Sequence, residues 1–458
     1  MPYKVRVNAR LTAALFLAAI LLASLCSCSL KANERERRTR QAARAIQGES
    51  LALEEKKSAA LDKYIQSLAE RERLAQLFVI NLEGDEKFSF VERVDDGGQK
   101  DRPLVPGGYI FFSFNISNEP EKIAAFTDSV RDFARSNDLT EPFLCLDAEG
   151  GYVNRLRGVA GPLPENEWVA KNLSAKEAFL LYSLNAIQLR TLGFDLNLSP
   201  VVEVQNEGNA AFLDGRSFGS AQNVLVYGSA ALLAYQTNNV AAVLKHFPGN
   251  NSVDPHKALP VLNFSAAGFE RDVAEPFEAL AKDAPAGVLM SHALVSVDGL
   301  GQELSQGQAS LQGQKTPASL SPYWIRSVLR GRLGFKGLVF SDDIFMAALE
   351  KNGWPSERAV KGAILAGVNC ILMSEKRFAG EWKLVKKLYE GDADFRAAVD
   401  DSVRRVMKFK LDFGLLEYDY LSQKIVPAQE RPPLSERLEH FYGAKKLNQE
   451  ALEKYGQR

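Results

Sequence analysis

Eight short apolar segments recur between residues 77 and 374, separated by more polar stretches. They read "LFVINL" from residue 77, "GYIFF" from 108, "FLCLD" from 143, "FDLNLSP" from 194, "AAVLKHF" from 241, "GVLMSHA" from 287, "GLVFSDD" from 337 and "CILMS" from 370. Each is nearly continuous in apolar residues, and several contain β-branched or aromatic side chains. This pattern is typical of strands that are buried on both faces.

Helix-like segments lie between most of these predicted strands. The clearest are residues 119–136, 175–193, 223–239 and 321–333. Eight alternations of strand and helix predict an α/β protein whose catalytic domain is a single (β/α)8 barrel of the TIM type. An open, doubly wound sheet is the alternative architecture.

The first 28 residues differ from the rest of the chain. Lys4, Arg6 and Arg10 precede an apolar segment, residues 11–25, which is the layout of a secretory signal peptide. This segment is shorter than the roughly 20 residues that span a bilayer, although an uncleaved membrane anchor is the alternative. It leads into "LCSC", which resembles a bacterial lipobox with Cys28 as the lipidated residue. We therefore expect an exported protein, lipid-anchored in the bacterial cell envelope, in the periplasm or on the outer surface.

Two polar regions flank the predicted barrel, which occupies residues 68–418. Residues 29–67 are highly charged and nearly free of aromatic residues, which favours a solvated helical spacer. The arginines of this spacer suit an anionic membrane surface, and an ordinary exposed helix is the alternative. Residues 419–458 form a polar extension, which we expect to be a terminal helix or loosely packed.

Composition and charge narrow the range of functions. The 56 Lys and Arg residues nearly balance the 57 Asp and Glu residues, which gives no sign of a nucleic-acid partner. We find no Walker-type phosphate loop and no metal-spaced Cys or His, so the sequence implies no metal and no organic cofactor. Cys145 and Cys370 lie in apolar segments, where buried thiols are expected, and a disulfide is the alternative in an exported protein.

Polar residues follow the apolar segments at their carboxyl ends. They are Asp147, Asn197, Lys245, His246, His292, Asp342, Asp343 and Ser374. A single Asp after a strand is usually a helix cap. In a barrel, however, all these strand ends meet at one face, where barrel enzymes keep their active sites. The shared position of these residues is the sequence evidence for an enzyme.

Two of these regions suit the cleavage of a glycosidic bond. A carboxylate held at a strand end, as expected for Asp342, can attack an electrophilic carbon or stabilise an oxocarbenium-like cation. The loop "KHFPGNNSVDPHKALP" contains His246 and His256, two of only four His in the chain. Imidazole titrates near neutral pH, so His256 suits a general acid/base that Asp254 would orient. A plain turn with an exposed His256 is the alternative.

Four ordered motifs extend this picture over most of the predicted barrel. They are "LDAEGGYVNRLRG", "NLSPVVEV" with "DGRSFGS", "KHFPG" with "SVDPHKALP", and "PASLSPYWIRSVLRGRLGFKGLVFSDDIFMAAL". Together they resemble glycoside hydrolase family 3, in particular its β-N-acetylhexosaminidase branch. The resemblance implies the cleavage of terminal, β-linked N-acetylhexosamine.

The resemblance also implies roles for individual residues. Asp342 corresponds to the nucleophile, His256 to the acid/base and Asp254 to its dyad partner. The residues that would hold the sugar are Asp147, Arg216, Lys245 and His246, with Arg155 at the rim and His292 lining the pocket. For these binding residues, structural ion pairing is the alternative. The D-x-H pair favours the N-acetylglucosaminidase branch over β-glucosidases, which generally use a Glu from elsewhere.

The chain departs from the family pattern at two positions. Asn250 stands where the family usually has His, in a shortened loop, and Tyr152 follows the "EGG" where Arg is usual. Both changes bear on substrate preference, and neither removes a core catalytic group.

The sequence therefore predicts a retaining exo-β-N-acetylglucosaminidase that acts through a covalent glycosyl-enzyme. Its substrate would be a GlcNAc-containing glycan, and a muropeptide derived from peptidoglycan suits an exported, membrane-anchored protein. The alternatives are another family 3 β-glycosidase, such as a glucosidase or xylosidase, and a catalytically silent, glycan-binding envelope lipoprotein. The oligomeric state and the use of phosphate instead of water as acceptor stay open.

Overall fold

The structure is a computed structural model of the 458-residue chain that describes residues 31–88, 103–253, 257–298, 316–374 and 376–456. By its internal contacts the chain divides into two units, Met1–Ala60 and Leu61–Arg458. The predicted signal peptide and Cys28 lie outside the described residues. Within the described ranges, we find no helix with the length and apolar character needed to cross a membrane.

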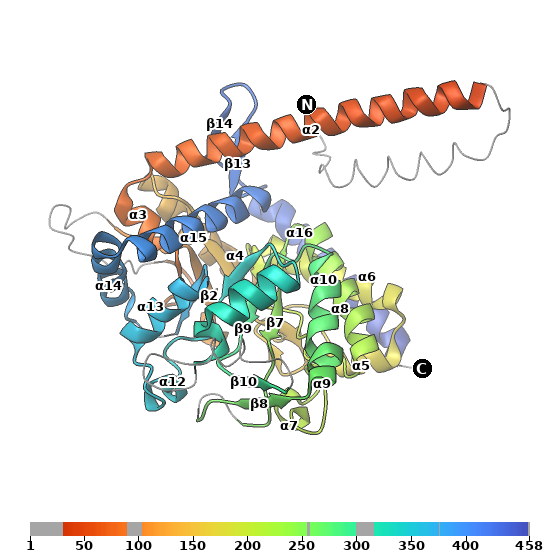
Figure 1. The fold of residues 1–458 in the computed structure, drawn as a ribbon. Helices are drawn as coiled ribbons and strands as arrows, with labels where there is room; N and C mark the ends of the chain where they lie inside the picture. Colours follow the sequence, from red (N-terminus) through yellow and green to blue (C-terminus); the bar gives the residue numbers. More distant parts are fainter. Residues whose placement is uncertain (1–30, 89–102, 254–256, 299–315, 375, 457–458) are drawn as a thin grey trace. The chain divides into compact units, whose positions relative to one another are not determined.

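Eight parallel strands form the central sheet of the second unit (Figure 1). They are β1 (Phe78–Asn81), β2 (Gly108–Phe111), β3 (Phe143–Leu146), β6 (Leu196–Asn197), β7 (Ala241–Phe247), β9 (Gly287–Met290), β11 (Leu338–Phe340) and β12 (Ile371–Met373). Their order is β11-β9-β7-β6-β3-β2-β1-β12, and a parallel bridge between Phe340 and Cys370 joins the two edge strands. The eight predicted strands and the barrel are confirmed, and the open sheet is excluded.

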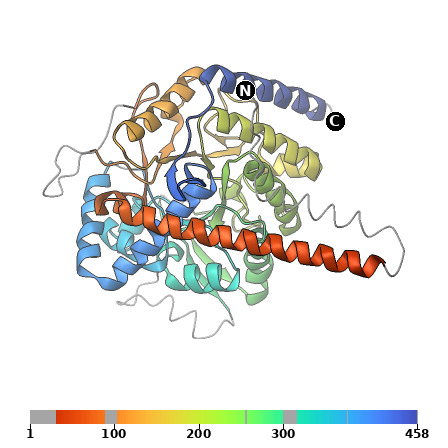
Figure 2. The same cartoon turned by 90° about the horizontal axis from the view of Figure 1, so that it is seen from above.

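Helices of this unit are arranged around the sheet (Figure 2). They are α3 (Glu70–Ala75), α4 (Pro120–Ser136), α5 (Asn166–Asn172), α6 (Ala175–Thr191), α7 (Ala210–Leu213), α8 (Ala221–Thr237), α9 (Ala266–Phe269), α10 (Glu275–Ala281), α12 (Ala347–Lys351), α13 (Ser356–Ala366), α14 (Phe378–Gly391), α15 (Ala393–Asp412) and α16 (Leu434–Gly456), with the 3-10 or π turns η1 (Ser113–Asn115), η2 (Glu270–Ala274), η3 (Ala318–Leu320) and η4 (Tyr323–Arg332). The helix α2 (Lys31–Ser67) begins in the first unit. The helix expected over residues 321–333 is present, but η4 is a π-helix.

Local sequence explains why these elements begin and end where they do. All seven residues of β7 are buried, as expected for a strand that is covered on both faces. Ser174 and Glu177 form a capping box at the start of α6, which satisfies two backbone donors. Gly367, at a φ of +108°, ends α13 in the left-handed conformation that glycine adopts without strain.

The amino end of the barrel is closed by apolar side chains. Val406 and Phe409 of α15 belong to the same buried cluster as the residues that point into the barrel. The rings of Phe143 and Phe409 meet edge to face, with their centroids 5.3 Å apart. Cys145 and Cys370 are free, buried thiols in this core, and burial raises the pKa of both. Buried thiols were predicted, and the alternative disulfide is excluded.

The opposite, carboxyl end of the barrel carries short strands and helices that are inserted between the barrel elements. The hairpin of β4 (Ala148–Gly150) and β5 (Val153–Asn154) follows β3, and β8 (Val261–Phe264) pairs with β10 (Leu294–Val297). In Figure 1, β8, β10 and α7 lie at the lower edge of the barrel. The hairpin of β13 (Leu416–Asp419) and β14 (Lys424–Pro427) follows α15.

The polar extension after residue 419 packs against the barrel helices through α16. Tyr442 donates a 2.7 Å hydrogen bond to Glu121 of α4, and Lys445 donates one of 2.7 Å to the carbonyl oxygen of Val159. Phe441 is buried. Of the two expected forms of this extension, the structure has the terminal helix.

Candidate active site

The end of β7 carries Lys245 and His246, and a change of register separates them. Lys245 lies opposite Leu289 of β9, and Phe247 lies opposite Met290, the next residue. His246 is therefore an extra residue in β7, which forms a β-bulge. A bulge redirects the side chains around it, and here Lys245 and His246 contact different carboxylates.

Lys245 is the centre of a buried charge network. Its Nζ atom lies 2.7 Å from Oδ1 of Asp147 and 2.5 Å from Oε1 of Glu149. Arg216 donates two hydrogen bonds to Glu149, from Nε to Oε2 at 2.7 Å and from Nη2 to Oε1 at 2.9 Å. Nη2 of Arg155 lies 3.3 Å from Oδ2 of Asp147. We call these five residues the Lys245 network, which brings together four predicted residues and Glu149.

The charges of the Lys245 network keep its two carboxylates and Lys245 ionised. Burial alone would raise the pKa of Asp147, but the positive charges of Lys245 and Arg155 outweigh it and lower this pKa to about 2. The pKa of Glu149 is also lowered, because Lys245 and Arg216 outweigh the effect of its burial. Burial would lower the pKa of Lys245, but Asp147 and Glu149 raise it overall. Asp147, Glu149 and Lys245 are therefore charged at neutral pH, and charged groups form stronger hydrogen bonds than neutral ones.

The network is accessible on the side of Asp147 and Arg155. Their side chains are 14% and 29% exposed, whereas those of Lys245 and Glu149 are 4% and 1% exposed. The Arg155 guanidinium also lies over the ring of Phe112, 5.8 Å from its centroid. Asp147 and Arg155 are thus the members most open to a ligand, and Glu149 supports Lys245 and Arg216 from the protein side.

Asn197, at the end of β6, holds the segment that carries both carboxylates. Its Oδ1 accepts the backbone N–H of Ala148 at 2.9 Å, and its Nδ2 donates to the carbonyl oxygen of Ala148 at 3.0 Å. Ala148 lies between Asp147 and Glu149 in the chain. Asn197 therefore positions the network without contributing a free polar group of its own.

Asp342 and Asp343 follow β11 and make different contacts. Asp343 accepts hydrogen bonds from the backbone N–H of Phe345 at 3.1 Å and of Ser374 at 3.3 Å, and from the Ser374 hydroxyl. It thereby ties its loop to the end of β12. Among the described residues, Asp342 accepts a side-chain hydrogen bond only from the backbone N–H of Asp343, at 2.9 Å. Asp342 is the carboxylate of this pair that stays available for chemistry.

His292, at the end of β9, supports the loop that carries Asp342. Its Nδ1 lies 2.6 Å from the Ser319 hydroxyl, and its Nε2 lies 3.1 Å from the carbonyl oxygen of Asp343. Because a carbonyl oxygen only accepts, Nε2 carries the proton and Nδ1 accepts from Ser319. Burial lowers the pKa of His292 and outweighs the charge of Asp342, which favours this neutral ring. With both nitrogens bonded to protein, His292 acts as a support in this structure.

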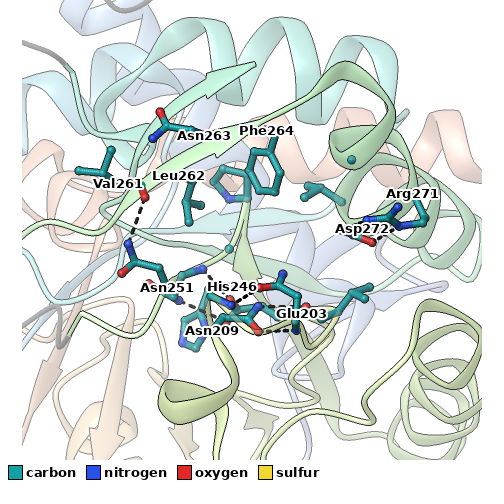
Figure 3. Close-up of a pocket in the computed structure, with 18 of the residues that line it drawn as sticks. Glu203, Asn209, His246, Asn251, Val261, Leu262, Asn263, Phe264, Arg271 and Asp272 are labelled. Carbon is teal, nitrogen blue, oxygen red and sulfur yellow. Dashed lines mark hydrogen bonds and ion pairs between the residues drawn. The ribbon is translucent and has the colours of Figure 1, made fainter. Parts of the chain in front are cut away.

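A cavity of about 400 Å³ lies beside β7, and we call it the side chamber (Figure 3). Its wall includes His246 and Glu203, together with residues of β8 and η2. Asp147, Arg216 and Asp342 do not line it. His246 of β7 lines the side chamber, whereas the preceding residue, Lys245, belongs to the Lys245 network. The candidate nucleophile is identified by its strand end and not by this cavity.

The predicted acid/base dyad, Asp254 and His256, lies outside the described residues. The loop that leads to it is anchored at its base. The backbone N–H of Ser252 donates to the carbonyl oxygen of Gly208 at 2.8 Å, and Nδ2 of Asn251 donates to that of Val261 at 3.0 Å. The assignment of the dyad stays a prediction from the sequence.

Sequence reasoning did not single out Glu149 and Glu203, although both leave a signal. Glu149 stands two residues after Asp147, so the two side chains share a face wherever the backbone is extended. Glu203 interrupts the apolar segment "PVVEV", where an acidic residue needs a partner.

In the parts of the chain that the structure describes, no group of three or more His, Cys, Asp or Glu side chains is arranged to hold a metal ion.

The fold and these residues define an α/β-barrel enzyme whose acidic and basic side chains gather at the carboxyl ends of the strands. Residues 72–409 match the Glycosyl hydrolase family 3 N terminal domain. The chain belongs to this family of glycoside hydrolases.

Similar proteins of known sequence and structure agree with this family. A β-hexosaminidase of Alkalilimnicola ehrlichii is 32% identical over 281 residues, which cover 58% of this chain and 73% of that protein. The solved structure of a glycoside hydrolase family 3 β-N-acetylglucosaminidase from Paenibacillus superposes with a TM-score of 0.65 at 25% identity, covering 82% of this chain and 68% of that one. A β-N-acetylhexosaminidase from Beutenbergia cavernae superposes with a TM-score of 0.61 at 25% identity, covering 75% of this chain and 99% of that one.

Proposed function

We propose that this glycoside hydrolase is a retaining exo-β-N-acetylglucosaminidase. The observation that carries the proposal is that an available carboxylate, Asp342, and the Lys245 network lie at the same end of one barrel. A carboxylate at a strand end is held with little freedom, and the network offers charged partners for sugar hydroxyls. The names of the similar proteins support N-acetylhexosamine as the sugar.

In the first step, a carboxylate oxygen of Asp342 attacks the anomeric carbon of the bound sugar. The bond to the leaving oxygen breaks, and His256 gives that oxygen a proton. The product is a glycosyl ester of Asp342 with inverted anomeric configuration. The sugar hydroxyls stay bound to the Lys245 network, so the ring is already oriented when charge develops at the anomeric carbon.

In the second step, His256 takes a proton from water, and the water oxygen attacks the anomeric carbon. The ester bond breaks and Asp342 returns to its carboxylate form. Two inversions give net retention of configuration. A neutral imidazole tolerates an approaching anion better than a carboxylate does, so phosphate is an acceptor that competes with water in this proposal.

The natural substrate that we propose is a peptidoglycan fragment with a terminal, β-linked GlcNAc. The signal layout of the first 28 residues and the lipobox at Cys28 support an exported protein with a lipid anchor in the cell envelope. The amount of the protein in the membrane fraction of cells that produce the full chain tests this anchor. Cys28→Ser is expected to move the protein out of this fraction, and an unchanged distribution would contradict the anchor.

Two measurements on the full chain test the activity. On a panel of nitrophenyl β-glycosides, turnover of the GlcNAc substrate is expected to exceed that of the glucose and xylose substrates. A preference for glucose or xylose would indicate another family 3 glycosidase. A fluorinated N-acetylglucosaminyl fluoride is expected to trap the glycosyl-enzyme, and peptide mass spectrometry should locate the label on Asp342. A label on another residue would overturn the mechanism.

A further inference from the structure

Glu203 is buried in the wall of the side chamber, beside His246 (Figure 3). Its Oε1 lies 2.6 Å from Nδ1 of His246 and 3.2 Å from Nδ2 of Asn250. Its Oε2 accepts the backbone N–H of Asn250 at 2.6 Å. Glu203, Asn250 and His246 are only 3%, 4% and 7% exposed. A buried carboxyl group with this many close partners is held in one orientation.

The backbone around Glu203 delivers these partners. Gly249 has a φ of +130°, which residues with a side chain rarely adopt, and a Cβ atom there would lie 3.5 Å from Oε2 of Glu203. This conformation lets the next residue, Asn250, direct both its N–H groups at Glu203. On the other side, the Ser217 hydroxyl donates a 2.5 Å hydrogen bond to the carbonyl oxygen of Glu203. Ser217 follows Arg216, so one segment supports both Glu203 and the Lys245 network.

The contacts define where the proton on His246 lies. Both groups of Asn250 can only donate, so both oxygens of Glu203 act as acceptors, as in an ionised carboxylate. The contact with His246 is then a hydrogen bond donated by Nδ1–H. In the neutral ring, Nε2 therefore carries a lone pair and accepts hydrogen bonds. No residue in the described part of the chain is hydrogen-bonded to this Nε2.

We propose that Glu203 is a positioning residue for the glycosidase reaction. Together with Asn250, it holds His246 in the Nδ1–H tautomer, so that Nε2 accepts a hydrogen bond from a free hydroxyl of the bound sugar. The proposal rests on the proposed function and defines the substrate class further. A sugar with a free hydroxyl at this position is bound, and a sugar with an ether at the same position is rejected because it has no proton to donate.

The position of Asn250 fits this role. Its amide donates but does not titrate, unlike the His that stands there in the family pattern. Asn250 thus donates to Glu203 through both its backbone N–H and its side-chain amide. The neighbouring Asn251 provides a matched control, because it bonds to the carbonyl oxygen of Val261 and makes no hydrogen bond to Glu203 in this structure.

The tautomer can be measured directly. The full-length chain has only four His, so labelling the imidazole nitrogens with ¹⁵N gives a spectrum that single substitutions can assign. His246 is expected to show a protonated Nδ1 and a bare Nε2 in the wild type. Glu203→Gln should shift this signature, because the new amide donates on one side. Asn250→Ala should shift it less, and Asn251→Ala should leave it unchanged.

Kinetics test the consequence for the substrate. Glu203→Gln is expected to lower kcat/KM for the nitrophenyl GlcNAc substrate by about 10- to 100-fold, by analogy with the loss of carboxylates that orient metal-bound imidazoles. Mono-O-methyl ethers of this substrate isolate the hydroxyl that meets Nε2. The wild type should reject one ether strongly, and Glu203→Gln should discriminate less at that position. Asn251→Ala should keep the wild-type discrimination.

The outcomes separate this proposal from the proposed function. A wild-type His246 with its proton on Nε2 would overturn the positioning role, whatever the enzyme cleaves. So would a Glu203→Gln variant that loses activity while the ¹⁵N signature and the ether discrimination stay as in the wild type. An expected ¹⁵N signature without any turnover of GlcNAc substrates would support the positioning of His246 and contradict the proposed function.

Discussion

The carboxyl and amino ends of the barrel each contain a buried cluster of charged side chains. At the carboxyl end, the Lys245 network joins Asp147 and Glu149 to three cations. At the amino end, Asp195 lies 2.6 Å from Nη2 of Arg131 and 2.9 Å from both Nη1 of Arg190 and Nη2 of Arg431. Both clusters pair carboxylates with cationic side chains at similar distances.

The two clusters differ in how far their charged side chains are exposed to a ligand. The carboxyl group of Asp195 also accepts the backbone N–H of Leu144 at 2.9 Å, and its side chain is 1% exposed. Every part of this carboxylate is used to join α4, α6 and the segment before α16 to the base of β3. In the Lys245 network, Asp147 and Arg155 stay partly exposed at the open end of the barrel. Position at the carboxyl ends of the strands, together with access, distinguishes the site from the structural cluster.

Shifted pKa values do not distinguish them. Burial would raise the pKa of Asp195, but its arginines outweigh this effect and lower it, as the cations do for Asp147. At the amino end, burial also lowers the pKa of Lys410 to about 7, although Glu141 opposes the shift. A lysine that titrates near neutral pH would be a catalytic candidate in a cleft. Lys410 instead donates 2.6 Å hydrogen bonds to Gln76 and to the backbone of Glu141 inside the closed end.

The largest effect is expected from Asp342→Ala. Removing the nucleophile should lower kcat for a nitrophenyl GlcNAc substrate on the order of a thousandfold or more, because no covalent intermediate forms. The melting temperature should stay close to that of the wild type, since the carboxylate has one local hydrogen bond. Equal rates in the two proteins would contradict the assignment, and no turnover by either would favour a silent, glycan-binding protein.

Asp195→Asn should lower the stability of the fold and leave the activity unchanged, the reverse of Asp342→Ala. It removes the charge that compensates the buried Arg131 and two partly buried arginines, so the free energy of unfolding is expected to fall by about 3 to 5 kcal/mol. Below the melting transition, kcat/KM should match the wild type, because the cluster is at the closed end. Urea unfolding and initial rates measure the two quantities. Asp412→Asn, at an exposed ion pair with Lys408, is the control and should change stability by less than about 1 kcal/mol.

The free energy of unfolding should also depend on pH above 7, because of Lys410 at the amino end of the barrel. Folded Lys410 loses its proton near pH 7, whereas in the unfolded chain it keeps the proton up to about pH 10. The unfolded state therefore binds more protons between these values, and stability should rise with pH by up to about 1.4 kcal/mol per unit from this group. Unfolding measured at several pH values should show a smaller rise for Lys410→Met. An equal rise in both proteins would assign it to other groups.

The smallest effect is expected in acid, from Asp147. Its pKa is about 2 when folded and 3.8 ordinarily, so its contribution is present above pH 4 and is lost as the pH falls toward 2. This shift corresponds to about 2 kcal/mol. The stability difference between the wild type and Asp147→Asn should therefore narrow by this amount over that range. A constant difference would show that Asp147 is not held ionised by Lys245 and Arg155.

The candidate site could be outlined from the sequence because its residues stand at the ends of the strands. Asp147, Lys245, His246 and Asp342 were found from the polar residues that end apolar segments, and the barrel brings all these ends to one face. The same reasoning gave no role to Glu203, which lies beyond the end of β6. It also placed Lys245 and His246 in one group, although their carboxylate partners, Asp147 and Glu203, come from different segments of the chain.

The amino-acid sequence by itself determined the eight strands, their alternation with helices and the polar residues at their carboxyl ends, because burial on two faces and chain direction are local properties. Only the tertiary structure decided which charge meets which. Lys245 and Asp147 are 98 residues apart, and they pair because β3, β6 and β7 are neighbours in the closed sheet. The orientation of His246 likewise depends on Glu203 and Asn250, which meet it from a separate segment and from the following loop. Such contacts depend on the register of the strands and on the closure of the barrel, and neither can be read from a short stretch of sequence.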